Sequence, residues 1–161
     1  MAAVDMFLKL NGVDGESPDT KHPGEIQLDG FRLHGSSPLE RMTGGKEGKG
    51  AVKLANFTCF SKVDKATPLL FARLCTNDVI PTAILTCRKA GKEQFEYFKV
   101  TLTDVLIMKV EARCGEGDEE VVPRCEFDLA YGKIEVEYRE QTPKGPTTGT
   151  VKFMFDLRKN V

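Results

Sequence analysis

Apolar and polar residues alternate with a period of two along much of the chain. The pattern is clearest near its end, where Cys125, Phe127 and Leu129 are separated by charged residues. It recurs over residues 134–138 and 151–157. Such alternation is typical of a β-strand that buries one face and exposes the other to water. Each of these segments therefore predicts a strand with one buried face.

Six earlier segments have the composition of strands and are bounded mostly by turn residues. Asn11-Gly12 and Tyr131-Gly132 are two such turns, because Asn and Gly tolerate a positive φ. By contrast, Gln141–Gly149 is rich in Gly, Pro and Thr and predicts a loop. The six predicted strands are Val4–Leu10, Glu25–Leu33, Ala51–Ser61, Thr82–Arg88, Phe95–Leu102 and Val105–Val110.

One short helix is predicted over residues 67–76. Thr67 can cap it, and Pro68 suits the first helical position, where a missing N–H costs nothing. A helix of this length is expected to pack across an opening or flank of the sheet. The apolar residues expected on its buried face are Leu70, Phe71 and Leu74.

These elements predict an all-β fold, an antiparallel barrel or sandwich of about eight or nine strands with one short flanking helix. The length of 161 residues is common for one domain, and no linker or internal repeat divides the chain. We therefore expect residues 1–161 to form a single β-barrel domain.

The charge balance argues against two classes of partner. Lys and Arg together number 23 and Asp and Glu 24, so the net charge is -1. No general attraction to nucleic acid follows from such a balance. Apolar runs such as 69–72 and 105–108 fall far short of the ~20 residues that a membrane-spanning helix needs. We expect neither a nucleic-acid partner nor membrane insertion.

The candidate chemistry is sparse. Five cysteines occur at long, irregular spacings, which indicates folding in a reducing cytoplasm and gives no pair with metal-ligand spacing. His22 and His34 are twelve positions apart, and His22 is interpreted as a turn residue. A cysteine nucleophile would need a histidine brought near by the fold, which the sequence leaves open. The sequence predicts no catalytic, metal or cofactor-binding residue, no cofactor, and no enzymatic activity.

A second class of function is a ligand-binding module. Small β-barrels bind oligosaccharides or oligonucleotides through aromatic side chains exposed on a strand face. This chain has no Trp, and most of its ten Phe and three Tyr occupy positions expected to face the core. The ligand-binding reading stays open as the alternative. The clearest of the expected core aromatics are Phe127, Phe153 and Phe155.

Several segments, read in order, resemble one family over nearly the whole chain. The resemblance is to the Hcp family, the haemolysin-coregulated tube proteins of bacterial type VI secretion systems. Its most specific carrier is Lys62–Leu70, the stretch that enters the predicted helix. The other carriers are Asp5–Leu10, Gly15–Ser17, Glu25-Ile26, the Gly-rich stretch before Gly50, Pro81 with Ala83–Leu85, Arg88–Gly91, Glu96-Tyr97, Thr101-Leu102, Phe153–Arg158 and Asn160-Val161.

The resemblance implies a structural protein. Six subunits would close into a ring, and rings would stack head to tail into the inner tube that a contractile sheath ejects. Spike and sheath proteins would be partners, and small effector proteins could travel in the lumen. The protein would be made in the bacterial cytoplasm and then secreted by the type VI system without a signal peptide.

Two residues are candidates for the lumen of such a ring. In the second predicted strand Phe31 and Leu33 occupy the apolar phase, so Arg32 and His34 point to the opposite face. In the resembling family that opposite face lines the channel. We expect Arg32 and His34 to contact cargo, unless a bulge at Gly30 shifts the phase and leaves them as ordinary solvated residues.

A charged loop is the candidate for ring stacking. The Gly-rich segment 40–53 carries a cluster of cations, and the turn 116–120 carries a cluster of carboxylates. Exposed pairs are each worth only ~0–1 kcal/mol, but a ring would repeat the contact. The predicted cations are Arg41, Lys46, Lys49 and Lys53, and the predicted acidic partners are Glu116, Asp118, Glu119 and Glu120.

Overall fold

The computed structural model describes residues 3–37, 52–91, 93–115, 122–142 and 145–161. Within this part of the chain, almost all regular structure is β-strand, which confirms the all-β prediction. The elements are β1 (Val4–Leu10), β2 (Ile26–Arg32), β3 (Gly35–Ser36), β4 (Lys53–Leu54), β5 (Phe57–Lys62), α1 (Ala66–Thr76), β6 (Ile80–Lys89), β7 (Phe95–Arg113), β8 (Arg124–Ala130), β9 (Lys133–Thr142) and β10 (Gly145–Asp156).

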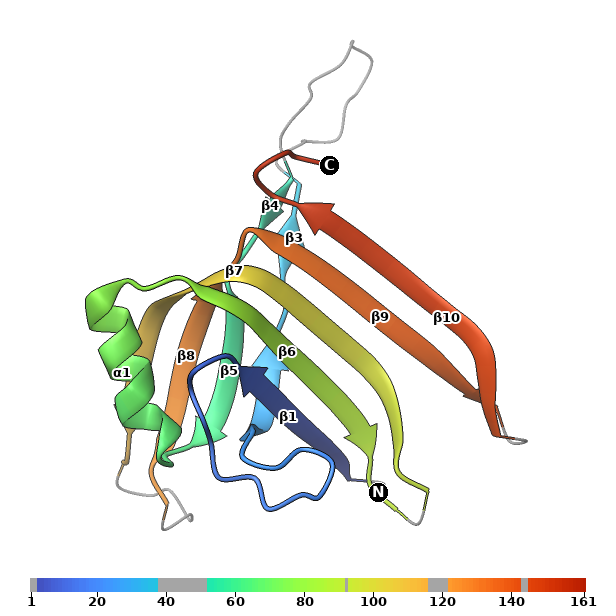
Figure 1. Ribbon diagram of the computed structural model, residues 1–161, viewed down its shortest axis with the longest axis horizontal. Helices are drawn as coiled ribbons and strands as arrows, with labels where there is room; N and C mark the ends of the chain where they lie inside the picture. Colours follow the sequence, from blue (N-terminus) through green and yellow to red (C-terminus); the bar gives the residue numbers. More distant parts are fainter. Residues whose placement is uncertain (1–2, 38–51, 92, 116–121, 143–144) are drawn as a thin grey trace.

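Eight of these strands form one continuous antiparallel sheet. Its order is β10-β9-β7-β6-β1-β2-β5-β8, and β7 also pairs with β8. This additional pairing closes the strands from β7 to β8 into a barrel, while β9 and β10 project from it (Figure 1). We call these two projecting strands the wing. Helix α1 packs on the barrel on the side away from the wing (Figure 1).

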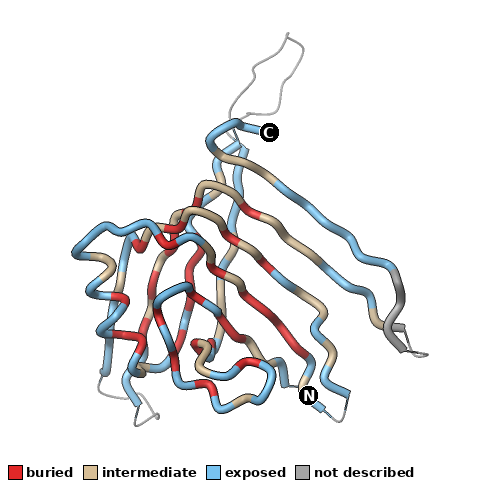
Figure 2. The backbone as a smooth tube through the Cα atoms, viewed as in Figure 1, coloured by how far each residue is buried: buried red, intermediate tan, exposed pale blue. Residues whose placement is uncertain are grey.

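The core lies inside the barrel, where the inward side chains of every barrel strand meet. Phe57 of β5 and Phe127 of β8 are fully buried there, as are Ile26 and Leu85. The buried residues follow the alternation of the strands and form one contiguous cluster (Figure 2). Because each large apolar side chain contributes about 1.5–3 kcal/mol when it leaves water, this cluster is the main source of stability.

Strand β7 belongs to both the wing and the barrel. Its first half pairs with β9 over residues 98–103, and its second half pairs with β8 over residues 106–113. Between the halves, Asp104 has a φ of 54° in the left-handed region. The prediction of two separate strands is therefore wrong. One strand continues through this local irregularity, which appears in the sequence as a break in the alternation of apolar and polar residues.

Three further predictions need correction. The segment 141–149 is mostly strand and not loop, because β9 and β10 extend into it and pair there. The predicted strand 51–61 is divided into β4 and β5. Thr67 lies inside α1 and is not its cap: the N-cap position is Lys65, and Asp64 Oδ1 accepts the N–H of Ala66 at 2.9 Å just before the helix.

Candidate functional site

The inner face of the wing is apolar and largely uncovered. It continues the face that points into the barrel, because the register aligns Val136 with Val100 of β7 and Phe153 with Val136. Exposure increases with distance from the barrel: Ile134 is 1% exposed, Tyr138 47% and Val151 71%. Figure 2 shows this change along the two outermost strands. The residues that share this face are Ile134, Val136, Tyr138, Val151, Phe153 and Phe155.

The outer face of the wing is charged and internally paired. Lys152 Nζ lies 3.6 Å from Glu135 and 3.4 Å from Glu137, and the Arg139 Nε donates to Glu137 at 2.9 Å. These contacts, that of Arg139 above all, hold the pKa of Glu137 below its usual value. Only Met154, which is 51% exposed, interrupts this face with an apolar side chain among the described residues. The two faces of one ribbon therefore differ sharply in polarity.

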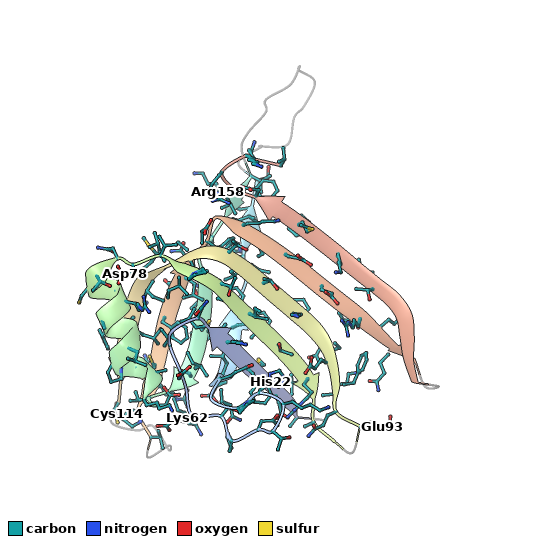
Figure 3. All side chains as sticks on the ribbon, in the orientation of Figure 1. His22, Lys62, Asp78, Glu93, Cys114 and Arg158 are labelled. Carbon is teal, nitrogen blue, oxygen red and sulfur yellow. The ribbon has the colours of Figure 1, made fainter. Side chains whose placement is uncertain are left out.

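An ion cluster attaches the end of the wing to the barrel. Arg158 donates to Asp104 at 2.6 Å and lies 3.6 Å from Asp156. Although burial acts to raise it, the backbone N–H groups of Lys159 and Arg158 hold the pKa of Asp156 below its usual value. Figure 3 shows Arg158 beyond the end of β10. This cluster ties the residues that follow β10 to Asp104 of β7.

The predicted lumen residues are exposed and point away from the barrel core. A bulge does occur between Leu28 and Gly30, as considered for Gly30, yet Phe31 still packs against the core cluster. Arg32 and His34 are both exposed. The predicted phase is therefore correct for these residues, whereas their position in a lumen stays a prediction.

The predicted stacking residues fall mostly outside the described residues. Lys53 is described: it is exposed on β4 and pairs with Ser36 of β3. The other predicted cations and acids of the stacking contact lie outside the described part of the chain. Those residues are Arg41, Lys46, Lys49, Glu116, Asp118, Glu119 and Glu120.

The structure also places the residues considered for the other functions: a cysteine nucleophile, a metal site and a ligand-binding face of aromatic residues. Burial raises the pKa of the Cys87 thiol to about 11 and that of Cys59 well above its usual value, so neither is a ready nucleophile at neutral pH. Among the described residues, no cluster of three His, Cys, Asp or Glu side chains could hold a metal ion. Phe153, predicted to be in the core, is 51% exposed on the wing.

A second layer, which the sequence analysis did not predict, covers part of the outside of the barrel. Phe7 lies in the outward phase of β1 but is buried, because the loop formed by residues 11–25 folds over it. His22 of that loop stacks on the Phe7 ring, with the ring centres 4.5 Å apart. Figure 3 shows His22 in this loop beside β1. His22 lies in a bend, as predicted, but its buried position was missed.

A buried arginine completes this second layer. Arg88 of β6 donates to Asp5 at 2.9 Å and to Asp19 at 2.7 Å, and its guanidinium lies over the Phe7 ring. The hydrogen bond from Arg88, together with those from the backbone N–H groups of Lys21 and His22, holds the pKa of Asp19 well below its usual value. One signal of this layer was present in the sequence. Phe7 is an apolar residue at a position of the polar phase, between Asp5 and Lys9.

No helix among the described residues is long and apolar enough to cross a membrane. This finding agrees with the short apolar runs in the sequence.

Comparison with known proteins places this fold in one family. A family model described as type VI secretion system effector, Hcp, matches residues 7–138. The protein hcp1 of Pseudomonas aeruginosa is 34% identical over 161 residues, which cover 99% of this chain and 98% of that protein.

Solved structures give the same assignment. The crystal structure of Hcp1 from Salmonella typhimurium matches with a TM-score of 0.78 and 32% identity, covering 100% of this chain and 99% of that one. A structure of a type six secretion system protein has the same fold, with a TM-score of 0.90, 24% identity and 99% of each chain covered. The chain therefore belongs to the Hcp family of type VI secretion system proteins.

Proposed function

We propose that this chain is the structural subunit of a type VI secretion tube. In this proposal, copies of the chain close into hexameric rings, and the rings stack head to tail. The role is architectural and involves no catalysis. Family membership supports the general role, and the wing supports assembly as the means.

The observation that carries the proposal is the exposed inner face of the wing. Val151 and Phe153 are 71% and 51% exposed on the edge strand β10, which pairs with β9. Contiguous apolar surface of this kind on a soluble domain marks an interaction site. Covering one Val or Phe side chain completely yields about 1.5–3 kcal/mol, so another copy packed on this face would be held by several such gains.

The strand at the tip of the wing supports the same conclusion. β10 is hydrogen-bonded to β9 on one side and has no strand partner on its other side within the described residues. Unpaired edges are a liability unless another surface covers them. A wing that packs against a different surface of the next copy makes a head-to-tail contact, and such contacts generate rings when the rotation closes.

Within such a ring, we assign Arg32 and His34 to the lumen. Both are exposed, and their side chains point away from the barrel core. A ring of guanidinium groups favours acidic cargo, because like charges around one channel are relieved by a negative ligand. Arg32→Glu should leave rings intact and abolish co-purification of an acidic effector protein. Undiminished co-purification would refute the lumen assignment.

For stacking, we propose that the cations Arg41, Lys46, Lys49 and Lys53 meet the acidic turn at residues 116–120 of the next ring. The exposed position of Lys53 is compatible with this role. Stacking should then weaken with added salt and with reversal of the charges at Lys46 and Lys49. Stacking that is indifferent to both changes would exclude the contact.

Spike and sheath proteins would contact the assembled tube. The subunit would be made in the bacterial cytoplasm and leave the cell as part of the ejected tube.

The test of the proposal is the mass and shape of the purified protein. Native mass spectrometry at micromolar concentration should give the mass of six copies, and electron microscopy should show rings with a central hole. A protein that is only monomeric under these conditions would contradict the proposal.

A further inference from the structure

The loop that covers Phe7 is attached to the barrel by a histidine between two carboxylates. His22 Nδ1 lies 3.0 Å from Glu25 Oε2, and His22 Nε2 lies 2.9 Å from Glu96 Oε1. The His22 side chain is only 9% exposed. Glu25 lies at the end of the same loop, whereas Glu96 belongs to β7. The Nε2 contact therefore joins the loop to the barrel, as the ion pair between Asp19 of the loop and Arg88 of β6 does a few residues earlier.

The two contacts together specify a protonation state. An ionised carboxylate only accepts hydrogen bonds, and a neutral imidazole has one N–H to donate. Neutral His22 could satisfy one carboxylate and would turn a lone pair toward the other. The bridge is complete when both ring nitrogens carry a proton, so that His22 is an imidazolium cation.

The charged groups around His22 include more carboxylates than cations. Glu25 and Glu96 face the ring directly, and Asp19 Oδ1 accepts the backbone N–H of His22 at 3.2 Å. Asp19 is bound in turn to Arg88, which also binds Asp5. This cluster contains four carboxylates and one permanent cation, Arg88. A protonated His22 supplies the second cation.

We propose that His22 is a pH-dependent clasp for the loop of residues 11–25. When protonated, His22 bridges Glu25 and Glu96 and holds the loop on the barrel. When it loses its proton, the ring keeps one hydrogen bond and the Glu96 contact opens. Glu96 is the partner released, because its side chain is 44% exposed and water can replace the ring, whereas that of Glu25 is 14% exposed.

The direction of the pH effect follows from the bridge. Its contribution to holding the loop is present while His22 is protonated, and is lost when His22 gives up its proton. Histidine is the side chain that ordinarily changes charge between about pH 5 and pH 8. The loop is thus closed in mild acid and looser in mild base.

Hydrogen exchange of the loop amides tests the clasp. The amides of Gly15, Ser17 and Gly24 donate to carbonyls within the loop itself, so their protection reports how far the loop keeps its folded form. After correction for intrinsic exchange rates, protection in the wild type should fall about tenfold between about pH 5.5 and about pH 8, as expected for loss of one hydrogen bond to a charged group. Protection that is unchanged over this range would overturn the proposal.

Three variants sharpen the test. His22→Asn should reduce protection at low pH and remove its pH dependence. Glu96→Gln should remove the pH dependence as well, because an amide can pair with a neutral imidazole. His34→Asn, at the other histidine of the chain, should behave as the wild type. Retained pH dependence in His22→Asn or Glu96→Gln would contradict the clasp.

A spectroscopic measurement on the wild type avoids any dependence on how the variants fold. The chain has two histidines, so their imidazole ¹⁵N signals can be assigned with His34→Asn. At low pH both ring nitrogens of His22 should show bound protons and couplings to carboxylate acceptors. A His22 ring with one protonated nitrogen throughout this pH range would refute the proposal.

Discussion

Strands β8 and β10 carry the same alternating pattern but differ in burial. In β8, Phe127 and Leu129 are completely buried, whereas in β10, Val151 and Phe153 are 71% and 51% exposed. The difference lies in their neighbours, since β8 closes the barrel whereas, among the strands that the structure describes, β10 pairs with β9 alone. Alternation therefore reports which face of a strand is apolar, but not what covers that face.

The wing consequently has the residue pattern of a barrel strand, although the described chain leaves much of its apolar face uncovered. Its inner face is apolar, and its outer face is charged and paired, as in a strand whose inner side is covered. The barrel should respond to mutation through its own stability, and the wing through association. Substitutions in the two regions can test this separation.

The largest effect is expected for Phe127→Ala in the barrel. Removing a fully buried ring leaves a cavity and should lower the free energy of unfolding by ~3–5 kcal/mol. Phe153→Ala should change it by only ~0.5 kcal/mol when the chain is monomeric, because surface substitutions cost little. Urea unfolding followed by circular dichroism, at a concentration where the chain is monomeric, measures both. Equal losses of unfolding free energy in the two variants would contradict the difference between barrel and wing.

An intermediate effect is expected for Asp19→Asn, on the outer layer of the barrel. In the folded protein the Arg88 contact holds the pKa of Asp19 well below its usual 3.8. A depressed pKa contributes stability that is present above the unfolded value and is lost as the pH falls. Wild-type stability should therefore decline below about pH 4, and Asp19→Asn should be less stable at neutral pH with a shallower acid decline.

Asp14→Asn provides the control for this experiment. Asp14 is exposed in the same loop, away from the Arg88 cluster. Its acid unfolding curve, recorded by fluorescence or circular dichroism, should match that of the wild type. If Asp19→Asn also gave the acid unfolding curve of the wild type, the Arg88 contact would not stabilise the fold.

The smallest effect is expected on the outer face of the wing. Lys152→Gln removes the contacts with Glu135 and Glu137, but Lys152 is 53% exposed. Exposed pairs contribute ~0–1 kcal/mol and are screened by salt. The free energy of unfolding should fall by ~0.5 kcal/mol or less at low salt and be unchanged at high salt. A loss of unfolding free energy that persists in high salt would mean that the aliphatic part of the Lys152 side chain stabilises the wing by packing.

Local pattern was enough to predict most strands, because each strand alternates in register with the barrel interior. The predicted strand 4–10 agrees with β1 at both ends, and the phase of Arg32 survives the bulge at Gly30. Prediction was wrong where local pattern and tertiary pairing diverge. Residues 141–149 read as a loop, yet pairing between β9 and β10 extends into them.

The candidate sites were harder to predict for a physical reason. Phe153 and Phe155 look identical in sequence, and only the distance from the barrel leaves Phe153 exposed. His22 looks like a turn residue, and its role depends on Glu96, 74 positions away in the chain. Contacts between distant segments leave no periodic trace, so the second layer over Phe7 required the structure.

Assembly through the inner face of the wing is tested most directly by comparing Phe153→Glu with Met154→Glu. The two residues are adjacent on β10 and equally exposed, at 51%, but they lie on opposite faces of the wing. Native mass spectrometry should find Met154→Glu assembled like the wild type and Phe153→Glu as a folded monomer. Assembly of Phe153→Glu, or equal loss of assembly in both variants, would contradict the inner face of the wing as the contact between copies.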